Sequence, residues 1–206
     1  MDVTLIKEKP KSRKEIKTYS KVESKMGEII SFAKKEIQYG NQVFWVCPLI
    51  EKSEKLNHQS AVEKSKYLKK HFNNRVGLIH GLIDNEKKNK ILKDFLDKKI
   101  DVLVSTTVIE VGIDFPNANL IVIENADKFG LAQLHQLRGR VGRGKKQGVC
   151  ILLFKKNLSK NSIKRIKILK NSNDGFVIAE HDMELRGFGD LIGFQQSGEK
   201  FFKFAD

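Results

Sequence analysis

Cysteine is scarce in this sequence of 206 residues, with only Cys47 and Cys150 and no CxxC pair. Both lie inside apolar runs, the usual setting of buried, reduced thiols, so we expect neither a disulfide framework nor a cysteine metal centre. The five histidines lack metal-ligand spacing, and we therefore expect no metal site in this chain.

Long apolar runs are also missing. No stretch approaches membrane-spanning length, and residues 1–25 mix charged side chains with isolated apolar ones rather than forming a signal-peptide core. We expect a cytoplasmic protein that makes no membrane contact. The apolar content of 40% is enough for a packed core, so the composition is not that of a disordered chain.

Negative charge is in the minority. The chain has 39 Lys and Arg against 25 Asp and Glu, a net charge of +14, and a pI near 9.7. Such an excess favours a polyanionic partner, although a lysine-rich proteome would produce the same numbers without a binding function.

Arginine is rare among these cations: seven residues, against 32 lysines. Three of the seven, Arg138, Arg140 and Arg143, fall within six residues and alternate with glycines. A guanidinium can hold two phosphate oxygens at once, and the glycines permit close backbone approach to a ligand. The pattern predicts a phosphate-facing cluster. The alternative is a solvated basic turn or a non-specific nucleic-acid patch.

Short apolar runs alternate with stretches of helical periodicity along most of the chain. Strands are expected at 43–47, 76–80, 101–104, 120–123 and 149–154, and helices at 26–38, 60–72, 85–95 and 131–137. This order predicts an α/β fold with a parallel sheet flanked by helices. Phe44 and Trp45 are expected in its core rather than stacked on bases.

Two terminal segments break the alternation. Residues 1–25 contain β-like stretches at 3–6 and 16–19, which we interpret as a lead into the domain. After 154, helices are expected at 161–169 and 176–185, followed by a glycine-rich loop at 186–198. We therefore predict one domain over 1–155 and a helical hairpin with a loop over 156–206.

Ligands of parallel sheets gather beyond the carboxyl ends of the strands, where Ser105 and Thr106 follow an expected strand. Their hydroxyls can meet a phosphate or a sugar-phosphate backbone, while Asp114 can bind a ribose hydroxyl or orient an arginine. The alternative is a Ser/Thr-rich helix cap followed by an ordinary turn. We expect this segment and the arginine cluster to face one crevice.

The segments 106–114 and 136–143 resemble motifs V and VI of superfamily 2 helicases. The longer string 123–144 is similar to the RecG family of branch-migrating helicases and to its relative, the transcription-repair coupling translocase, and the segments 44–54 and 173–176 favour RecG. The resemblance runs from about residue 20 to residue 200. It implies the second of two RecA-like lobes, with ATP in the cleft between them.

The resemblance also implies a role for each matching position. Arg140 and Arg143 would be arginine fingers that reach the γ-phosphate. The others would act as follows: Gln136 and Arg138 would link the nucleotide to the interlobe contact, Gly112 and Asp114 would lie beside the nucleotide, and Ser105 and Thr106 would lie nearer the DNA backbone. His80, at the end of an expected strand, could border DNA, or could be a structural cap.

The region after 155 resembles the translocation motif of this family, in which arginines and a glutamine couple lobe closure to movement along duplex DNA. The matching residues are Arg165, Arg186 and Gln196. The alternative for both arginines is simple pairing with acidic residues at 180–184.

The chain contains no GxxxxGK[ST] motif and no Asp-Glu pair at the end of an apolar strand, which this superfamily needs to hold ATP with Mg²⁺. We therefore expect the isolated chain not to hydrolyse ATP, because ATP and Mg²⁺ would be bound mainly by a missing first lobe. The resemblance implies that the first RecA-like lobe and a wedge domain normally precede residue 1.

The leading hypothesis is the motor lobe of a bacterial, nucleoid-associated helicase that remodels stalled forks and Holliday junctions, with branched or forked DNA as partner. Three alternatives are a lobe of the transcription-repair coupling translocase, a nucleic-acid-binding module without catalysis, and an RNA helicase lobe. The segment after 155 disfavours the last of these.

Overall fold

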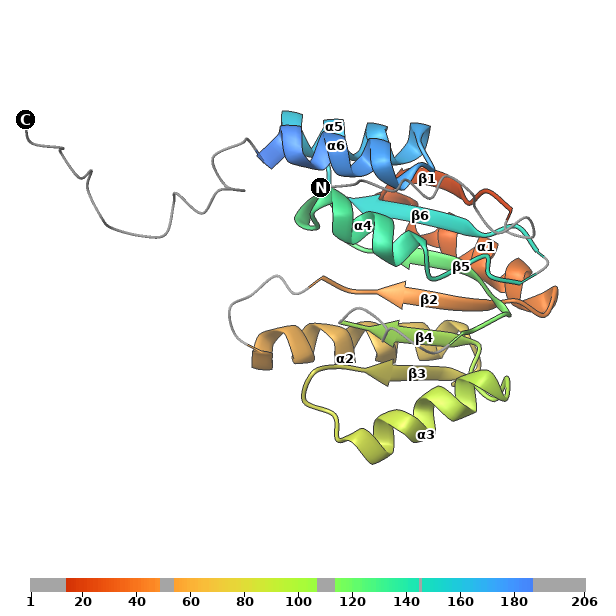
Figure 1. The fold of residues 1–206 in the computed structure, drawn as a ribbon. Coiled ribbons are helices and arrows are strands. Elements are labelled where there is room, and N and C mark those ends of the chain that lie inside the picture. Colours follow the sequence, from red (N-terminus) through yellow and green to blue (C-terminus); the bar gives the residue numbers. More distant parts are fainter. Residues whose placement is uncertain (1–13, 49–53, 107–113, 145, 187–206) are drawn as a thin grey trace, which may run out of the picture.

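Six parallel strands form one sheet at the centre of the molecule (Figure 1). The computed structural model describes residues 14–48, 54–106, 114–144 and 146–186, apart from the side chains of 54–58 and 186. The strands are β1 (Lys17–Val22), β2 (Gln42–Val46), β3 (Val76–Ile79), β4 (Val102–Ser105), β5 (Ala118–Ile123) and β6 (Val149–Phe154). Their order across the sheet is β1-β6-β5-β2-β4-β3, which confirms the predicted parallel α/β fold.

One strand departs from the prediction. Strand β1 lies in the segment that the sequence assigned to a lead into the domain, yet it pairs with β6 and forms the edge of the sheet, with Lys17 opposite Val149. Its side chains alternate between exposed and half-buried. An edge strand covered on one face shows this alternation, whereas strands covered on both faces read as continuous apolar runs.

Helices cover both faces of the sheet. They are α1 (Met26–Gln38), α2 (Glu54–His71), α3 (Asn85–Leu96), α4 (Leu131–Arg138), α5 (Lys160–Asn171) and α6 (Gly175–Arg186), with short 3₁₀ turns η1 (Glu23–Lys25) and η2 (Ala126–Lys128). Helix α1 has the predicted bounds, while α2 begins before the expected 60–72.

The core divides into two layers because successive strand residues point to opposite faces. In β2, Phe44 belongs to the apolar layer that contains residues of α3, α4, α5 and α6, whereas Trp45 belongs to the layer that contains residues of α1 and α2. Both side chains have no exposed surface, which confirms their predicted place in the core. Phe44 also contacts the rings of Phe95 and Phe115 at centroid distances of 5.3 and 5.5 Å.

The two cysteines are free and buried in this core, as predicted. Burial raises the pKa of the Cys47 thiol far above its usual range, and raises the pKa of Cys150 to about 12. Both therefore stay protonated and unreactive in the folded chain.

The predicted helical hairpin is present as α5 and α6. Its residues Ile166, Leu169 and Ile178 belong to the same apolar layer as α4. The division at residue 155 stays a prediction. Among the described residues, no helix has both the length and the apolar character to cross a bilayer, and no group of His, Cys, Asp and Glu side chains is placed to hold a metal ion.

Candidate functional site

The arginine-rich segment forms a tight turn, residues 139–144, between α4 and β6. Val141 is fully buried and anchors the turn, and the Gly142 N–H donates to the Ala118 carbonyl at 3.2 Å. Gly142 has φ +68°, and a Cβ there would meet the Gly148 nitrogen at 2.9 Å. Position 142 therefore requires glycine, and the turn is held against the amino ends of β5 and β6.

The same turn lies against the segment that leads into β5. A Cβ on Gly144 would collide with the Pro116 carbonyl oxygen. Arg143 Nη1 lies 3.7 Å from Asp114 Oδ1, and Arg143 Nε donates to the Gly139 carbonyl at 3.3 Å. The Arg143 side chain is 33% exposed and that of Asp114 is 61% exposed, so a ligand can reach both.

Arg140 stands beside this pair and is half-buried. Its Nε is buried and has no hydrogen-bond partner among the described residues. Burial and then the nearby charge of Arg143 lower the pKa of Arg140. A guanidinium keeps its charge at neutral pH even so, and this charge would attract an anion to the turn.

Ser105 and Thr106 lie at the carboxyl ends of the strands, whereas the arginine turn lies at the amino ends. Ser105 ends β4 and is in register with Val46, which in turn pairs with Ile123 at the carboxyl end of β5. Asp114 comes before the amino end of β5. The expected single crevice is therefore wrong for the hydroxyl pair: the sheet separates it from Asp114 and Arg143 by the length of a strand.

The hydroxyl pair is tightly held. Both residues are buried, and the Thr106 N–H donates to the Ile79 carbonyl at 3.3 Å. Thr106 Oγ1 is buried without a partner in the part of the chain that the structure describes. His80 Nδ1, after the neighbouring strand β3, accepts from the Leu82 N–H at 3.2 Å, which is the bonding of a loop cap.

Arg138 does not join Arg140 and Arg143. It is 2% exposed, and its Nη1 donates to the carbonyls of Leu169 at 2.6 Å and Ser172 at 2.9 Å, at the end of α5. Its Nη2 lies 2.9 Å from His135 Nδ1. Arg138 therefore secures α5 to α4, away from the arginine turn. Gln136 is exposed on α4.

The helical phase of α4 explains why Arg138 is buried against α5. Leu131, Leu134 and Leu137 are buried on one side of α4, and Arg138 continues that side seven residues after Leu131. The spacing was visible in the sequence, but motif position alone assigned Arg138 to the nucleotide.

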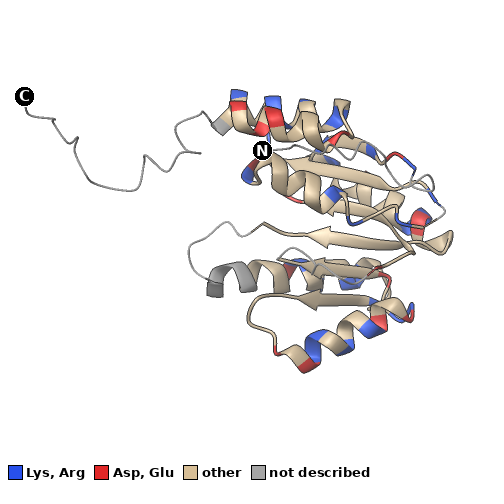
Figure 2. Cartoon of the chain, in the orientation of Figure 1, with Lys and Arg blue, Asp and Glu red and all other residues tan. Residues whose placement is uncertain are grey.

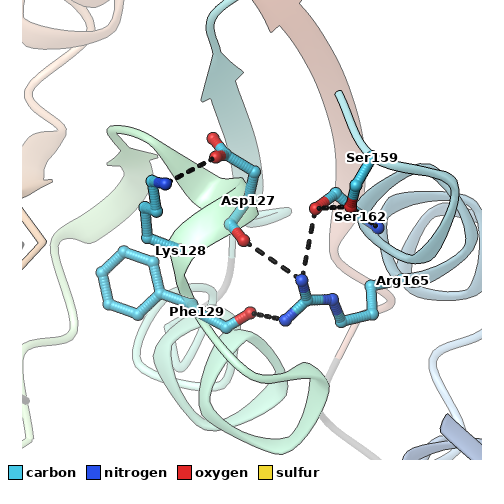
Figure 3. Close-up of polar contacts among 6 residues, drawn as sticks. All are labelled: Asp127, Lys128, Phe129, Ser159, Ser162 and Arg165. Atoms are coloured by element: carbon cyan, nitrogen blue, oxygen red, sulfur yellow. Dashed lines mark hydrogen bonds and ion pairs between the residues drawn. The ribbon is translucent and has the colours of Figure 1, made fainter. Parts of the chain in front are cut away.

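Arg165, in the middle of α5, makes a similar contact (Figure 3). Its guanidinium donates to the carbonyls of Phe129 at 2.7 Å and Asp127 at 3.2 Å, and to Ser162 Oγ at 3.2 Å. The alternative of pairing with acidic residues at 180–184 is wrong for Arg165, whose hydrogen-bond partners among the described residues are backbone carbonyls and a hydroxyl. Gly112, Gln196 and the side chain of Arg186 lie outside the described residues.

One buried network was not predicted. Glu124, directly after β5, is 9% exposed, and its Oε1 accepts from Trp45 Nε1 at 2.7 Å and pairs with Lys64 Nζ at 2.8 Å. Glu124 lies at the carboxyl ends of the strands, as Ser105 does. A carboxylate immediately after an apolar strand was the available signal.

A parallel sheet of this order, covered by helices on both faces and carrying an arginine-glycine turn at its amino edge, defines a RecA-like lobe of the helicase class. The helicase conserved C-terminal domain model matches residues 23–145, more than half of the chain, and the chain belongs to that family. A second model, described as ATP-dependent DNA helicase RecG, domain 3, C-terminal, matches residues 172–206.

Known proteins of similar sequence support the same family. The chain is 45% identical to the ATP-dependent DNA helicase RecG of Bacillus subtilis over 208 residues, covering 100% of this chain and 30% of that protein. It is 46% identical to RecG of Thermotoga maritima, covering 100% of this chain and 26% of the relative. The chain thus spans less than a third of these relatives.

A solved structure of RecG bound to a three-way DNA junction matches with a TM-score of 0.77 and 43% identity, over 89% of this chain and 24% of that one. The Mycobacterium smegmatis helicase Lhr, bound to single-stranded DNA and AMP-PNP, matches with a TM-score of 0.55 at 15% identity, over 77% of this chain and 22% of that one, which supports the fold alone. The RecG matches favour the RecG resemblance over the transcription-repair coupling translocase.

Proposed function

We propose that this chain is the C-terminal motor lobe of an ATP-dependent DNA helicase that remodels stalled replication forks and Holliday junctions. The observation that carries the proposal is the accessible Arg143–Asp114 pair beside Arg140, whose Nε has no hydrogen-bond partner among the described residues, in a chain similar to RecG along its whole length. The proposed partners are branched DNA and, within the longer protein, an N-terminal RecA-like lobe and a wedge domain; the proposed location is the bacterial nucleoid.

The arginine turn suits a triphosphate-binding site that another lobe completes. Arg140 and Arg143 present two guanidinium groups from one rigid turn, and Gly142 and Gly144 keep its backbone close to the strand ends. ATP supplies the phosphoryl group, with Mg²⁺ held mainly by the first lobe. Arg140 and Arg143 donate hydrogen bonds to the γ-phosphate oxygens and stabilise the charge that develops there during transfer.

Asp114 has a positioning role in this proposal. Its carboxylate orients Arg143 before the lobes close, and a triphosphate then competes for the same guanidinium. Since the pair is partly exposed and long, it holds the side chain without binding it so tightly that a phosphate could not displace it.

The two ends of the parallel strands would have different binding roles. Ser105 and Thr106, which are buried at the carboxyl ends of the strands, would lie near the DNA backbone. At the amino ends, Arg143 would contact the nucleotide and Asp114 would orient Arg143. Arg138 joins the end of α5 to α4, and Arg165 joins α5 to η2 and Phe129, just before α4. The arginine turn and the hairpin therefore move as one body, which is how closure on ATP would shift the hairpin along the duplex.

Replacing Arg143 with Ala in the full-length protein tests this function. We expect DNA-stimulated ATP hydrolysis to fall by roughly 10³-fold or more, as when an arginine finger is removed, while binding to a three-way junction is largely retained. Arg75→Ala is the matched control, because Arg75 pairs with Asp101 on another surface. Unchanged turnover in Arg143→Ala would remove the arginine turn from the nucleotide site.

A further inference from the structure

Helix α5 and the two lysines before it carry an unusual charge pattern. Residues 155–173 contain six lysines and one arginine and no Asp or Glu. The lysines are Lys155, Lys156, Lys160, Lys164, Lys167 and Lys170, and all six are exposed. Within the described residues, none of them forms an ion pair. The lysines near α3 differ, since Lys87 pairs with Asp84, and Lys99 with Asp94.

The orientation of α5 places a lysine row on its outer side. Ser162, Ile166 and Leu169 are buried, so they mark the inner side. Lys160, Lys164 and Lys167 are spaced by four and three residues and lie together on the opposite side. Figure 2 shows basic residues on the outer side of the hairpin and acidic residues on α6 beside it.

This lysine row has a fixed position. Arg165 ties the middle of α5 to η2, and Arg138 ties the end of α5 to α4. The row begins beside the carboxyl end of β6, which is the edge of the sheet that carries Ser105 and Thr106. It thus continues the surface proposed above to face DNA, on a helix that cannot turn its charged side away.

We propose that the outer side of α5 is a second DNA-binding surface, where Lys160, Lys164 and Lys167 contact phosphates of a duplex. This inference rests on the proposed DNA-helicase function. The outer two positions are seven residues apart, or about 10 Å along the helix. Duplex DNA offers a phosphate about every 3.4 Å of axis on each strand, so one strand can supply all three contacts. A row of ammonium groups without carboxylates matches a phosphate backbone in charge and carries no base specificity.

The test is the salt dependence of DNA binding by the full-length protein. Each neutralised phosphate adds about 0.9 to the slope of log K against log salt concentration. The triple variant Lys160→Gln, Lys164→Gln, Lys167→Gln should lower this slope by about 2.7 on duplex DNA. Between 50 and 200 mM salt, wild type should lose about 40-fold more affinity than this variant.

Two controls make the result specific. Lys66→Gln, Lys69→Gln, Lys70→Gln removes the same charge from exposed positions of α2, on the other face of the sheet, and should leave the slope unchanged. Replacing Lys160, Lys164 and Lys167 with Arg should retain the wild-type slope. Thermal unfolding of each variant checks that the fold is intact.

The outcomes separate this inference from the proposed function. If wild type shows DNA-stimulated ATP hydrolysis and the α5 triple variant keeps its full salt slope, the row is no DNA contact and faces water or an acidic protein, and the inference is overturned. An equal fall in slope for the α2 variant would also overturn it, since net charge alone would then be the cause. If wild type neither binds branched DNA nor hydrolyses ATP with it, the proposed function itself fails.

Discussion

The Asp114 carboxylate lies 3.7 Å from Nη1 of Arg143, across the contact between the segment leading into β5 and the turn leading into β6. The two segments are distant in the sequence and meet because Gly144 allows the turn to lie directly on Pro116. The pair thus joins the two motif segments at the amino edge of the sheet, where the proposed nucleotide site would be completed by a second lobe.

Replacing Asp114 with Asn should weaken the orientation of Arg143 without removing the guanidinium. Because an exposed ion pair contributes about 0.2–1 kcal/mol, we expect DNA-stimulated ATP hydrolysis by the full-length protein to fall by no more than about fivefold. The control is Asp97→Asn, which removes a carboxylate that pairs with Lys99 elsewhere on the surface. A loss as large as that of Arg143→Ala would mean that Asp114 itself contacts the nucleotide.

The sequence predicted the sheet well because most of its strands are covered on both faces. The run 43–47 is continuously apolar for that reason, and the alternation with helices left little freedom of topology. Strand β1 was missed as part of the sheet, since an edge strand with Lys17 and Lys21 lacks such a run. Its place depends on pairing with β6, far along the chain, which local patterns do not encode.

The candidate site was predictable in part. The possibility that Asp114 orients an arginine matches the observed pair. The separation of Ser105 from Asp114 follows from the predicted parallel sheet, because Ser105 ends one strand and Asp114 precedes the next. The contacts of Arg138 were hidden, because its acceptors, the Leu169 and Ser172 carbonyls, belong to a helix end more than thirty residues later. Side-chain identity shows that a donor exists, whereas its partner is decided by packing.

Gly144 offers a test of the contact between the two segments. Gly144→Ala would place a methyl group against the Pro116 carbonyl, and the backbone must then move. We expect a loss of about 1–3 kcal/mol in the free energy of unfolding, measured by urea denaturation. Gly27→Ala is the matched control, because its Cβ would meet no atom within 4 Å and alanine favours the helix. Equal stability of both variants would contradict the close packing of the turn.

Arg138 should be important for stability rather than for nucleotide contact. Arg138→Met fills the space but leaves two carbonyls at the end of α5 without their donor, so we expect a loss of about 1–3 kcal/mol and faster amide hydrogen exchange in α5 and α6. The exposed Arg75→Met should lose about 1 kcal/mol or less. If Arg138→Met left stability unchanged but weakened ATP binding by the full-length protein, Arg138 would have the nucleotide role that the helicase resemblance implied.

Glu124 connects Trp45 of β2 to Lys64 of α2 through one carboxylate, and the chain's single tryptophan makes this contact measurable. Glu124→Gln keeps an acceptor for the indole N–H but loses the charge opposite Lys64, whereas Glu124→Ala leaves both donors unpartnered. Because an unsatisfied buried polar group costs about 1–3 kcal/mol, the Ala variant should be the less stable of the two by roughly that amount. Unfolding followed by Trp45 fluorescence gives both values, and Lys64→Met separates the contribution of the ammonium group. If Gln and Ala proved equally stable, the indole hydrogen bond would contribute nothing, and Glu124 would act on α2 through its charge alone.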